Sequence, residues 1–304
     1  MRNLLTYLGL LCTLTSFGQH SPLISQYMLN GLVINPAYAG SRDVMTVNAM
    51  YRNQWVGFDG APVTQVVSAH APIKDKALSA GVLFNRENIG VTQSVAFSGQ
   101  VSYRIDMGTG KLAFGLSAGG NMLSARYSEL TTADGNDLVF AGDMQSHFQP
   151  DFGAGVYYSN KRFFAGFSVP TFAGRQYHFT NDRVSMRSDP SHYNYILHGG
   201  YLIDLNEDFK LKPSTLIRFT PSGTHQFDLN SNLIYRDRFW IGVSYRHKEA
   251  VVGLLEFQIN DQFRIGYAYD YALNMFRMYS GGSHEIGLQY EFGFRVKSMD
   301  PRFF

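Results

Sequence analysis

The sequence predicts an all-β protein: a transmembrane antiparallel β-barrel of about 14 strands, with an N-terminal signal peptide and a short periplasmic entry segment. Three observations lead to this prediction. Many segments alternate large apolar residues with small or polar ones, long and short connections alternate along the chain, and the composition is poor in charge and rich in aromatic residues. A closed barrel satisfies every backbone hydrogen bond without water, which an open sheet in lipid does not.

Residues 1–18 have the pattern of a secretory signal peptide. Arg2 supplies the positive charge, residues 4–14 form the apolar stretch, and 16–18 provide a cleavage site before Gln19. Cys12, the only cysteine, lies inside this peptide, so we expect no disulfide in the mature chain. Beyond residue 20 no stretch approaches the roughly 18 consecutive apolar residues of a membrane-spanning helix. An exported chain of this kind is either soluble or a barrel.

Residues 19–43 are predicted to form a periplasmic entry segment, or a plug of the barrel. A helix-like patch lies near 25–32. We expect Asn35-Pro36 to end it and to direct the chain into the first strand, because the residue before a proline avoids helical geometry.

The strands of the barrel, residues 44–296, are predicted from a period of two. In 263–271 one face carries a phenylalanine, an isoleucine and three tyrosines, and the other carries an arginine, a glycine, an alanine and an aspartate. In an outer-membrane barrel the apolar face contacts lipid and the polar face lines the lumen. The predicted strands are 44–52, 62–72, 77–86, 92–106, 110–122, 149–159, 161–170, 192–205, 208–219, 224–236, 238–246, 250–260, 262–272 and 283–296.

The connections support the barrel independently. Every second connection is a tight turn, whereas the others tend to be longer, above all 123–148 and 171–191. Short turns on one side and long loops on the other are typical of outer-membrane barrels. A soluble β-sandwich, the alternative, has no reason to sort its connections in this way and packs its apolar faces between two sheets.

The composition excludes several classes of function. Charged residues make up 16 % of the chain, below the roughly 25 % of a typical soluble domain, and aromatic residues make up 15 %. A net charge of +2 gives no electrostatic case for nucleic-acid binding. The chain lacks the Gly-x-Ser-x-Gly and His-Glu-x-x-His motifs. We therefore expect no enzyme activity, no cofactor and no metal site.

The face predicted to line the lumen carries charges of both signs. A ring of one sign would indicate an ion-selective pore, whereas a mixed set is expected to hold the interior together or to hold a plug. Arg52 is expected to pair with a lumen carboxylate such as Glu256 or Glu291. Trp55 is expected either in an interfacial aromatic girdle or at a partner. The predicted lumen charges are Arg104, Arg246, Arg264, Arg295, Asp106, Asp228, Glu256, Asp270 and Glu291.

The strand pattern does not explain three segments: 25–40, which contains Ile34-Asn35-Pro36-Ala37-Tyr38-Ala39-Gly40; 51–62, with Tyr51-Arg52-Asn53-Gln54-Trp55; and the tail 297–304, which ends in Arg302-Phe303-Phe304. Together they resemble the PorP/SprF family of Bacteroidota outer-membrane proteins, over residues 26–304. The positions that carry the resemblance, and that we take as partner candidates, are Asn35, Pro36, Gly40, Arg52, Gln54, Trp55, Arg302, Phe303 and Phe304.

The resemblance implies a component of the type IX secretion system and of gliding machinery. Such a protein is expected in the outer membrane with periplasmic termini, where it works with other secretion subunits and a peptidoglycan-binding periplasmic lipoprotein. It supports secretion and surface display of cargo such as adhesins. The alternative is an outer-membrane pore for small solutes, and a hydrolase at the barrel rim is a third hypothesis.

Overall fold

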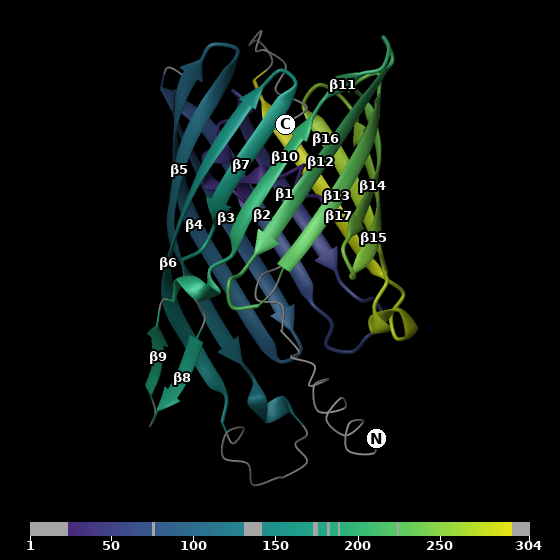
Figure 1. The fold of residues 1–304 in the computed structure, drawn as a ribbon. Coiled ribbons are helices and arrows are strands. Elements are labelled where there is room, and N and C mark those ends of the chain that lie inside the picture. The colour runs from purple at the N-terminus through teal and green to yellow at the C-terminus, as the bar shows by residue number, and fades with distance from the viewer. Residues whose placement is uncertain are drawn as a thin grey trace, which may run out of the picture.

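The computed structural model describes residues 24–74, 77–130, 142–172, 176–180, 183–187, 189–223 and 225–293, and the expectations for residues 1–18 and 297–304 lie outside these ranges. The chain forms a closed antiparallel barrel of 14 strands (Figure 1). The first strand pairs with the last, and β10 pairs with β12, so the sheet has no free edge. The fold class predicted from the sequence is confirmed.

The strands of the barrel have the following bounds: β1 (Met45–Asn53), β2 (Val63–Lys74), β3 (Leu78–Ile89), β4 (Thr92–Met107), β5 (Gly110–Ala125), β6 (Met144–Asn160), β7 (Phe163–Val169), β10 (Tyr195–Tyr201) with its short continuation β11 (Ile203–Asp204), β12 (Phe209–Phe219), β13 (His225–Tyr235), β14 (Phe239–Arg246), β15 (Ala250–Gln258), β16 (Phe263–Ala272) and β17 (Ser283–Phe292).

The connections separate into two kinds, as predicted. At one end, here called the turn end, consecutive strands are joined by tight turns such as 108–109, 161–162 and 236–238. At the other, the loop end, the connections include 126–143 and 170–194. The exceptions at the loop end are 90–91, where β3 extends further than predicted and leaves a two-residue turn, and 247–249, which is three residues long. The loop predicted at 171–191 contains a hairpin of β8 (Gln176–Thr180) and β9 (Arg183–Arg187).

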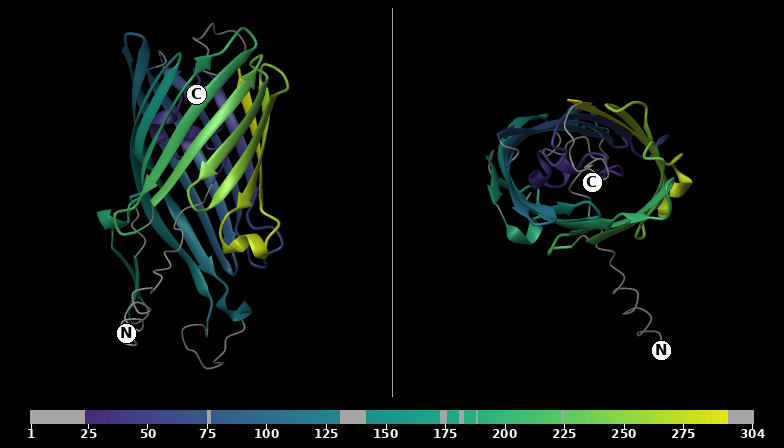
Figure 2. Two further views of the ribbon diagram at one scale, coloured as in Figure 1. Left: turned by 45° about the vertical axis from the view of Figure 1, so that its right-hand side comes forward. Right: turned by 90° about the horizontal axis from the view of Figure 1, so that it is seen from above.

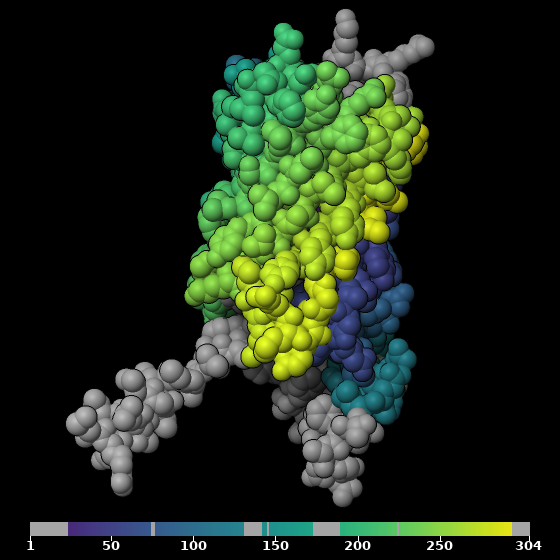
Figure 3. All heavy atoms as spheres, turned by 90° about the vertical axis from the view of Figure 1, so that its right-hand side faces the viewer, coloured from purple at the N-terminus to yellow at the C-terminus, as the bar shows by residue number. Residues whose placement is uncertain are grey.

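Side chains alternate between the outside and the lumen along each strand. In β16 Ile265, Tyr267 and Tyr271 are exposed, whereas Arg264 and Asp270 are buried. Large apolar side chains cover the outer surface of the barrel. Figure 3 shows the outer face that the later strands form. Because lipid surrounds such a wall, exposed apolar side chains carry no penalty there.

Residues 24–43, here called the lumen segment, lie inside the barrel, as the view from above in Figure 2 shows. The segment contains two short 3-10 helices, η1 (Gly31–Val33) and η2 (Pro36–Tyr38), instead of one helical patch near 25–32. Asn35 does not end a helix. It caps the start of η2, where its Oδ1 accepts a hydrogen bond from the backbone N–H of Ala37 at 2.9 Å.

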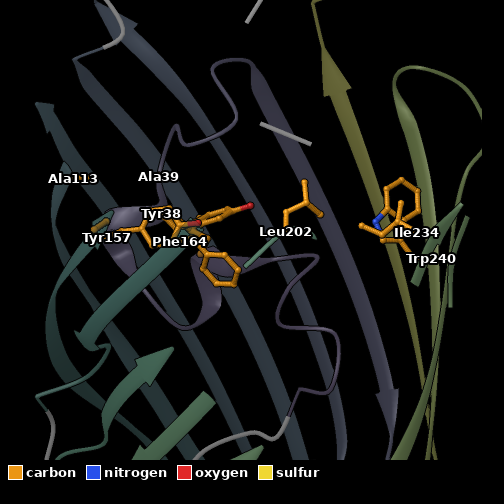
Figure 4. Packing of buried hydrophobic residues seen from close by; sticks show 10 residues of the cluster. Tyr38, Ala39, Ala113, Tyr157, Phe164, Leu202, Ile234 and Trp240 are labelled. Carbon is orange, nitrogen blue, oxygen red and sulfur yellow. The ribbon is translucent and has the colours of Figure 1, made fainter. Parts of the chain in front are cut away.

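Buried aromatic residues of β6 and β7 pack beside η2. The ring of Tyr38 lies edge-on to the ring of Tyr157, with 5.5 Å between centroids, and Phe164 adjoins Tyr157 (Figure 4). Within the described part of the chain, no helix is long and apolar enough to cross a membrane.

Candidate functional site

The first residues of the lumen segment are bound by carboxylates of the last two strands. Glu285 is fully buried, and its two oxygens accept hydrogen bonds from the backbone N–H groups of Ser25 and Gln26, both at 2.8 Å. The Ser25 hydroxyl donates to the Asp270 carboxylate at 2.9 Å. Hydrogen bonds to charged groups are stronger than neutral ones, so β16 and β17 hold this end of the segment firmly.

Arg52 links the segment to the same carboxylates. Its Nη2 lies 2.7 Å from Asp270, its Nη1 lies 3.1 Å from Glu285, and Nη1 also donates to the Ser25 hydroxyl at 3.0 Å. Arg246 adds a second guanidinium, 3.2 Å from Asp270. Arg52 therefore pairs with Asp270 and Glu285 and not with the carboxylates expected from the sequence.

The two carboxylates that had been expected to bind Arg52 have other partners. Glu291 pairs with Arg42 at 2.9 Å, and Glu256 lies 3.5 Å from Arg264. The reason is the closure of the barrel: β1 and β17 pair in a register that sets Arg52 opposite Glu285.

The middle of the segment contacts the opposite wall. Asn35 is fully buried; its Nδ2 donates to the carbonyl oxygen of Val156 at 3.0 Å and lies 3.4 Å from His198 Nε2. Gly40 has φ +74° and its N–H donates to His70 Nδ1 at 3.1 Å. A side chain at Gly40 would require a conformation that L residues rarely adopt and would overlap Ser79.

Wall side chains also bind carbonyl groups along the segment, so its backbone is paired in place of water. The bonds are Gln289 Nε2 to Leu29 O at 3.0 Å, Ser168 Oγ to Ile34 O at 2.6 Å, and Ser102 Oγ to Ala39 O at 2.8 Å.

The last residues of the segment are anchored at the turn end. Asp43 accepts from Arg104 at 2.7 Å and from Lys111 at 3.1 Å. Burial raises the pKa of Asp43, but the hydrogen bonds and charges of Arg104 and Lys111 together bring that pKa below its ordinary value.

Small residues on the lumen face make room for the segment. A Cβ at Gly115 would overlap the backbone of Ala37, and one at Gly287 would lie 2.6 Å from Leu29 Cδ2. The glycines that alternate with large apolar residues in β5 and β17 therefore allow close approach of the segment to the wall.

The segment runs along the lumen from the loop half of the barrel to the turn end. Ser25 contacts Asp270, two residues from the loop end of β16, and Asp43 contacts Arg104 and Lys111, which flank the turn 108–109. Of the range 19–43 expected as an entry segment or a plug, the described part thus lies within the lumen, and 19–23 fall outside the described residues.

A cavity of about 150 Å³ remains in the loop half of the lumen. The lumen segment contributes Ile24, Tyr27 and Ile34 to its lining, and the wall contributes Arg218 and Asp228 among others. The cavity is thus bounded by the segment on one side and by the strands on the other.

The candidate residues from the sequence do not form one site. Asn35, Pro36 and Gly40 lie in the lumen segment, and Arg52 binds its first residues. Their neighbours after β1 lie at the loop end: Gln54 donates its backbone N–H to the Pro62 carbonyl at 2.9 Å, and Trp55 stacks on Phe276 at 4.0 Å between centroids. The tail candidates Arg302, Phe303 and Phe304 lie outside the described residues.

Several residues that hold the segment were missing from the sequence prediction. Glu285 shares the inward parity of Gln289 and Glu291, so strand alternation could have identified it as a lumen residue. Arg42 and Asp43 precede the first strand, where no periodicity marks them. Of the predicted lumen charges, Asp106 is exposed near the turn end and Arg295 lies outside the described residues.

The closed barrel, its apolar outer face and its occupied lumen define an outer-membrane β-barrel protein. A family model described as "Type IX secretion system membrane protein PorP/SprF" matches residues 16–290. The chain belongs to this family, and the resemblance found in the sequence is confirmed.

Comparison with solved structures gives three outer-membrane proteins of low similarity. The chain is similar to the outer-membrane protein Omp33 of Acinetobacter baumannii (10 % identity, 84 % of this chain and 100 % of that chain, TM-score 0.48) and to a FadL homologue of Pseudomonas aeruginosa (12 %, 86 % and 94 %, 0.45). It is also similar to the KdgM porin (7 %, 82 % and 99 %, 0.37). These TM-scores lie below 0.5, so no inference is based on the matches. No curated protein matches the chain.

Proposed function

We propose that this type IX secretion protein is a filled barrel that anchors secretion subunits and cargo at the outer membrane and does not conduct solutes. The observation that carries the proposal is the lumen segment, which is fixed by buried ion pairs in the loop half and again at the turn end. Nothing in this role requires catalysis, and the proposal includes no enzyme activity.

The two ends of the barrel have different tasks in this proposal. Short turns in outer-membrane barrels face the periplasm, and longer loops face outward. The turn end then contacts a peptidoglycan-binding lipoprotein and other secretion subunits. The loop end, with the hairpin β8–β9 in connection 170–194, meets secreted cargo such as an adhesin, with surface display and gliding as the outcome.

Site-specific photo-crosslinking in the native outer membrane tests this division. A crosslinking residue at Lys161 in a tight turn probes the turn end, and one at Ser222 probes the loop end; both positions are exposed. The matched control is Leu255, whose side chain is exposed on the lipid-facing wall. We expect a periplasmic lipoprotein or secretion subunit from position 161 and cargo from position 222.

The control position is expected to capture neither class of protein. Recovery of no secretion subunit and no cargo from any position, with the barrel correctly assembled, contradicts the proposal.

A pore for small solutes is the second candidate. The cavity of about 150 Å³ in the loop half favours it, because the cavity leaves room for a small molecule inside the lumen. The pore predicts conductance steps of the wild-type protein in planar bilayers, whereas the filled barrel predicts none.

A further inference from the structure

The loop between β16 and β17, residues 273–282, forms a projection at the loop end of the barrel. It contains the 3-10 helix η5 (Met275–Met278). Seen from above, η5 lies outside the ring of strands (Figure 2), and Figure 3 shows the yellow atoms of this part of the chain on the outer surface. This projection, here called the η5 loop, takes no part in holding the lumen segment.

The η5 loop is held in place by the loop after β1. Trp55 stacks on Phe276 with 4.0 Å between centroids, and Phe58 lies edge-on to the same ring at 5.9 Å. Two backbone hydrogen bonds join Val56 to Gly281 and Gly282, at 2.7 and 2.8 Å. The side chains that the loop exposes are therefore presented by a fixed scaffold.

Apart from Arg277, the most exposed large side chains of the η5 loop are apolar. Met275 and Met278 are 71 % and 75 % exposed, and Tyr279 is 64 % exposed. A cluster of large apolar side chains at a surface marks a contact with a membrane or with another protein.

The apolar surface of the η5 loop continues the lipid-facing wall. The outward register of β16 carries Ile265, Tyr267 and Tyr271, and the same alternation extends through Leu273 to Met275. A tilted strand of roughly 9–11 residues spans the hydrocarbon layer, and β16 is 10 residues long. The η5 loop therefore begins where the hydrocarbon ends and the headgroups begin.

The charge of the η5 loop fits the headgroup region. Arg277 is the only charged residue of 273–282, so the loop carries +1. Its guanidinium lies 5.1 Å from the centroid of the Tyr271 ring, on the wall side of the loop. A cation above an interfacial tyrosine lies at the depth where lipid phosphates are found.

We propose that the η5 loop is a lipid-binding element that inserts Met275, Met278 and Tyr279 into the headgroup layer of the leaflet at the loop end, with Arg277 on a lipid phosphate. The fixed scaffold around Trp55 sets the depth of the barrel in the membrane. The proposal rests on the membrane location of the barrel and is independent of the partners proposed above.

Nitroxide labelling of the protein in phospholipid vesicles tests this proposal. Cys12 is the only cysteine, so Cys12→Ala with Met278→Cys gives a single labelling site. Leu255→Cys is the lipid reference and Ser222→Cys is the water reference, since both side chains are exposed. The measurement is the collision rate of each label with oxygen, which concentrates in lipid, and with a nickel chelate, which stays in water.

We expect the label at position 278 to lose nickel accessibility relative to position 222 and to gain oxygen accessibility, in the direction of position 255. In vesicles with an anionic phosphate lipid the label is expected to lie deeper than in vesicles with zwitterionic lipid alone. Arg277→Gln is expected to remove this difference and to leave the label at position 255 unchanged.

Two results overturn the proposal. If the label at position 278 meets the nickel chelate as often as the one at position 222, the apolar surface faces water and is left for a protein partner. If the depth of the label is the same in both kinds of vesicle, and Arg277→Gln changes nothing, no phosphate is bound by Arg277.

Discussion

Replacement of Arg52 by methionine is expected to release the first residues of the lumen segment. Methionine keeps much of the length of the side chain but removes its charge and its donors. The substitution abolishes the ion pairs with Asp270 at 2.7 Å and with Glu285 at 3.1 Å, and the hydrogen bond to Ser25 at 3.0 Å. The Arg52 side chain is only 3 % exposed, so water does not replace these partners.

The size of the destabilisation depends on the partners that Asp270 and Glu285 keep after the substitution. Loss of one partner from a buried ion pair costs about 3–5 kcal/mol of unfolding free energy, because a buried charge is left without compensation. Asp270 keeps Arg246 at 3.2 Å, and Glu285 keeps two backbone N–H donors at 2.8 Å. We therefore expect a loss near the lower end, about 3 kcal/mol.

Urea unfolding of the protein in lipid vesicles measures this loss, with hydrogen exchange at the Ser25 and Gln26 amides as a local readout. Arg126→Met is the matched control, because the pair of Arg126 with Glu129 has the same 2.7 Å separation but side chains 68 % and 52 % exposed. The control is expected to change the unfolding free energy by less than about 1 kcal/mol. If Arg52→Met destabilises the protein no more than Arg126→Met, and both amides stay protected, the segment is not held by these ion pairs.

Three further predictions concern the turn end, the lumen wall and the lipid face. The pKa of the Asp43 carboxyl is lowered in the folded protein. The carboxylate therefore stabilises the lumen segment fully above the ordinary pKa of about 3.9, and this stabilisation is lost as the pH falls through the lowered pKa. Hydrogen exchange of the segment amides, measured against pH, should become faster in acid. Asp43→Asn is expected to weaken the segment already at neutral pH and to flatten that acid dependence. Gly115→Val should lower the unfolding free energy by about 1–3 kcal/mol and expose the amide of Ala37 to exchange, because the valine side chain overlaps the Ala37 backbone. Gly253→Val is the control, because a Cβ there meets nothing within 4 Å. Equal exchange of the Ala37 amide in both variants contradicts the close approach of the segment to Gly115. Leu255→Lys, on the lipid face, should cost about 2–4 kcal/mol in urea unfolding from vesicles, and a change near zero is inconsistent with a wall in lipid at this position.

The strands were predictable because each follows from a local pattern. Alternation of apolar and polar side chains along 263–271 fixes which face is outward without knowledge of any other strand. Because tight turns and longer loops alternate along the chain, the order of the strands predicts an antiparallel barrel with two different ends. The prediction failed at turn 90–91, because the alternation does not show where the pairing of two strands stops. Polar residues such as Asn88 continue the pairing between β3 and β4.

The partners of the lumen charges were not predictable, because they depend on how the barrel closes. Arg52 lies on the inward face by parity alone, but its position opposite Glu285 is set by the register between the first and last strands. The sequence gives no signal for this register, since these strands are far apart in the chain and joined by no turn.

From the sequence, a position inside the lumen was only one of two predictions for the lumen segment, the other being a periplasmic entry segment. Residues 24–43 lack a period, because they form no long regular element: part of their backbone is paired in short 3-10 turns and part with side chains of the wall. The inward glycines were a signal that had been noted only as part of the polar face. Positions 115 and 287 require glycine because Ala37 and Leu29 lie against them and leave no room for a Cβ.

The conductance of the reconstituted protein in planar lipid bilayers tests the central claim, that the lumen is filled, most directly. We predict that the wild-type protein stays at the baseline, and that a variant without residues 24–43 shows discrete conductance steps once it is folded into the bilayer. Because the wild-type measurement stands alone, it is informative even if the deletion variant does not fold. Steady conductance of the wild-type protein, at the level expected of an open barrel, contradicts the account.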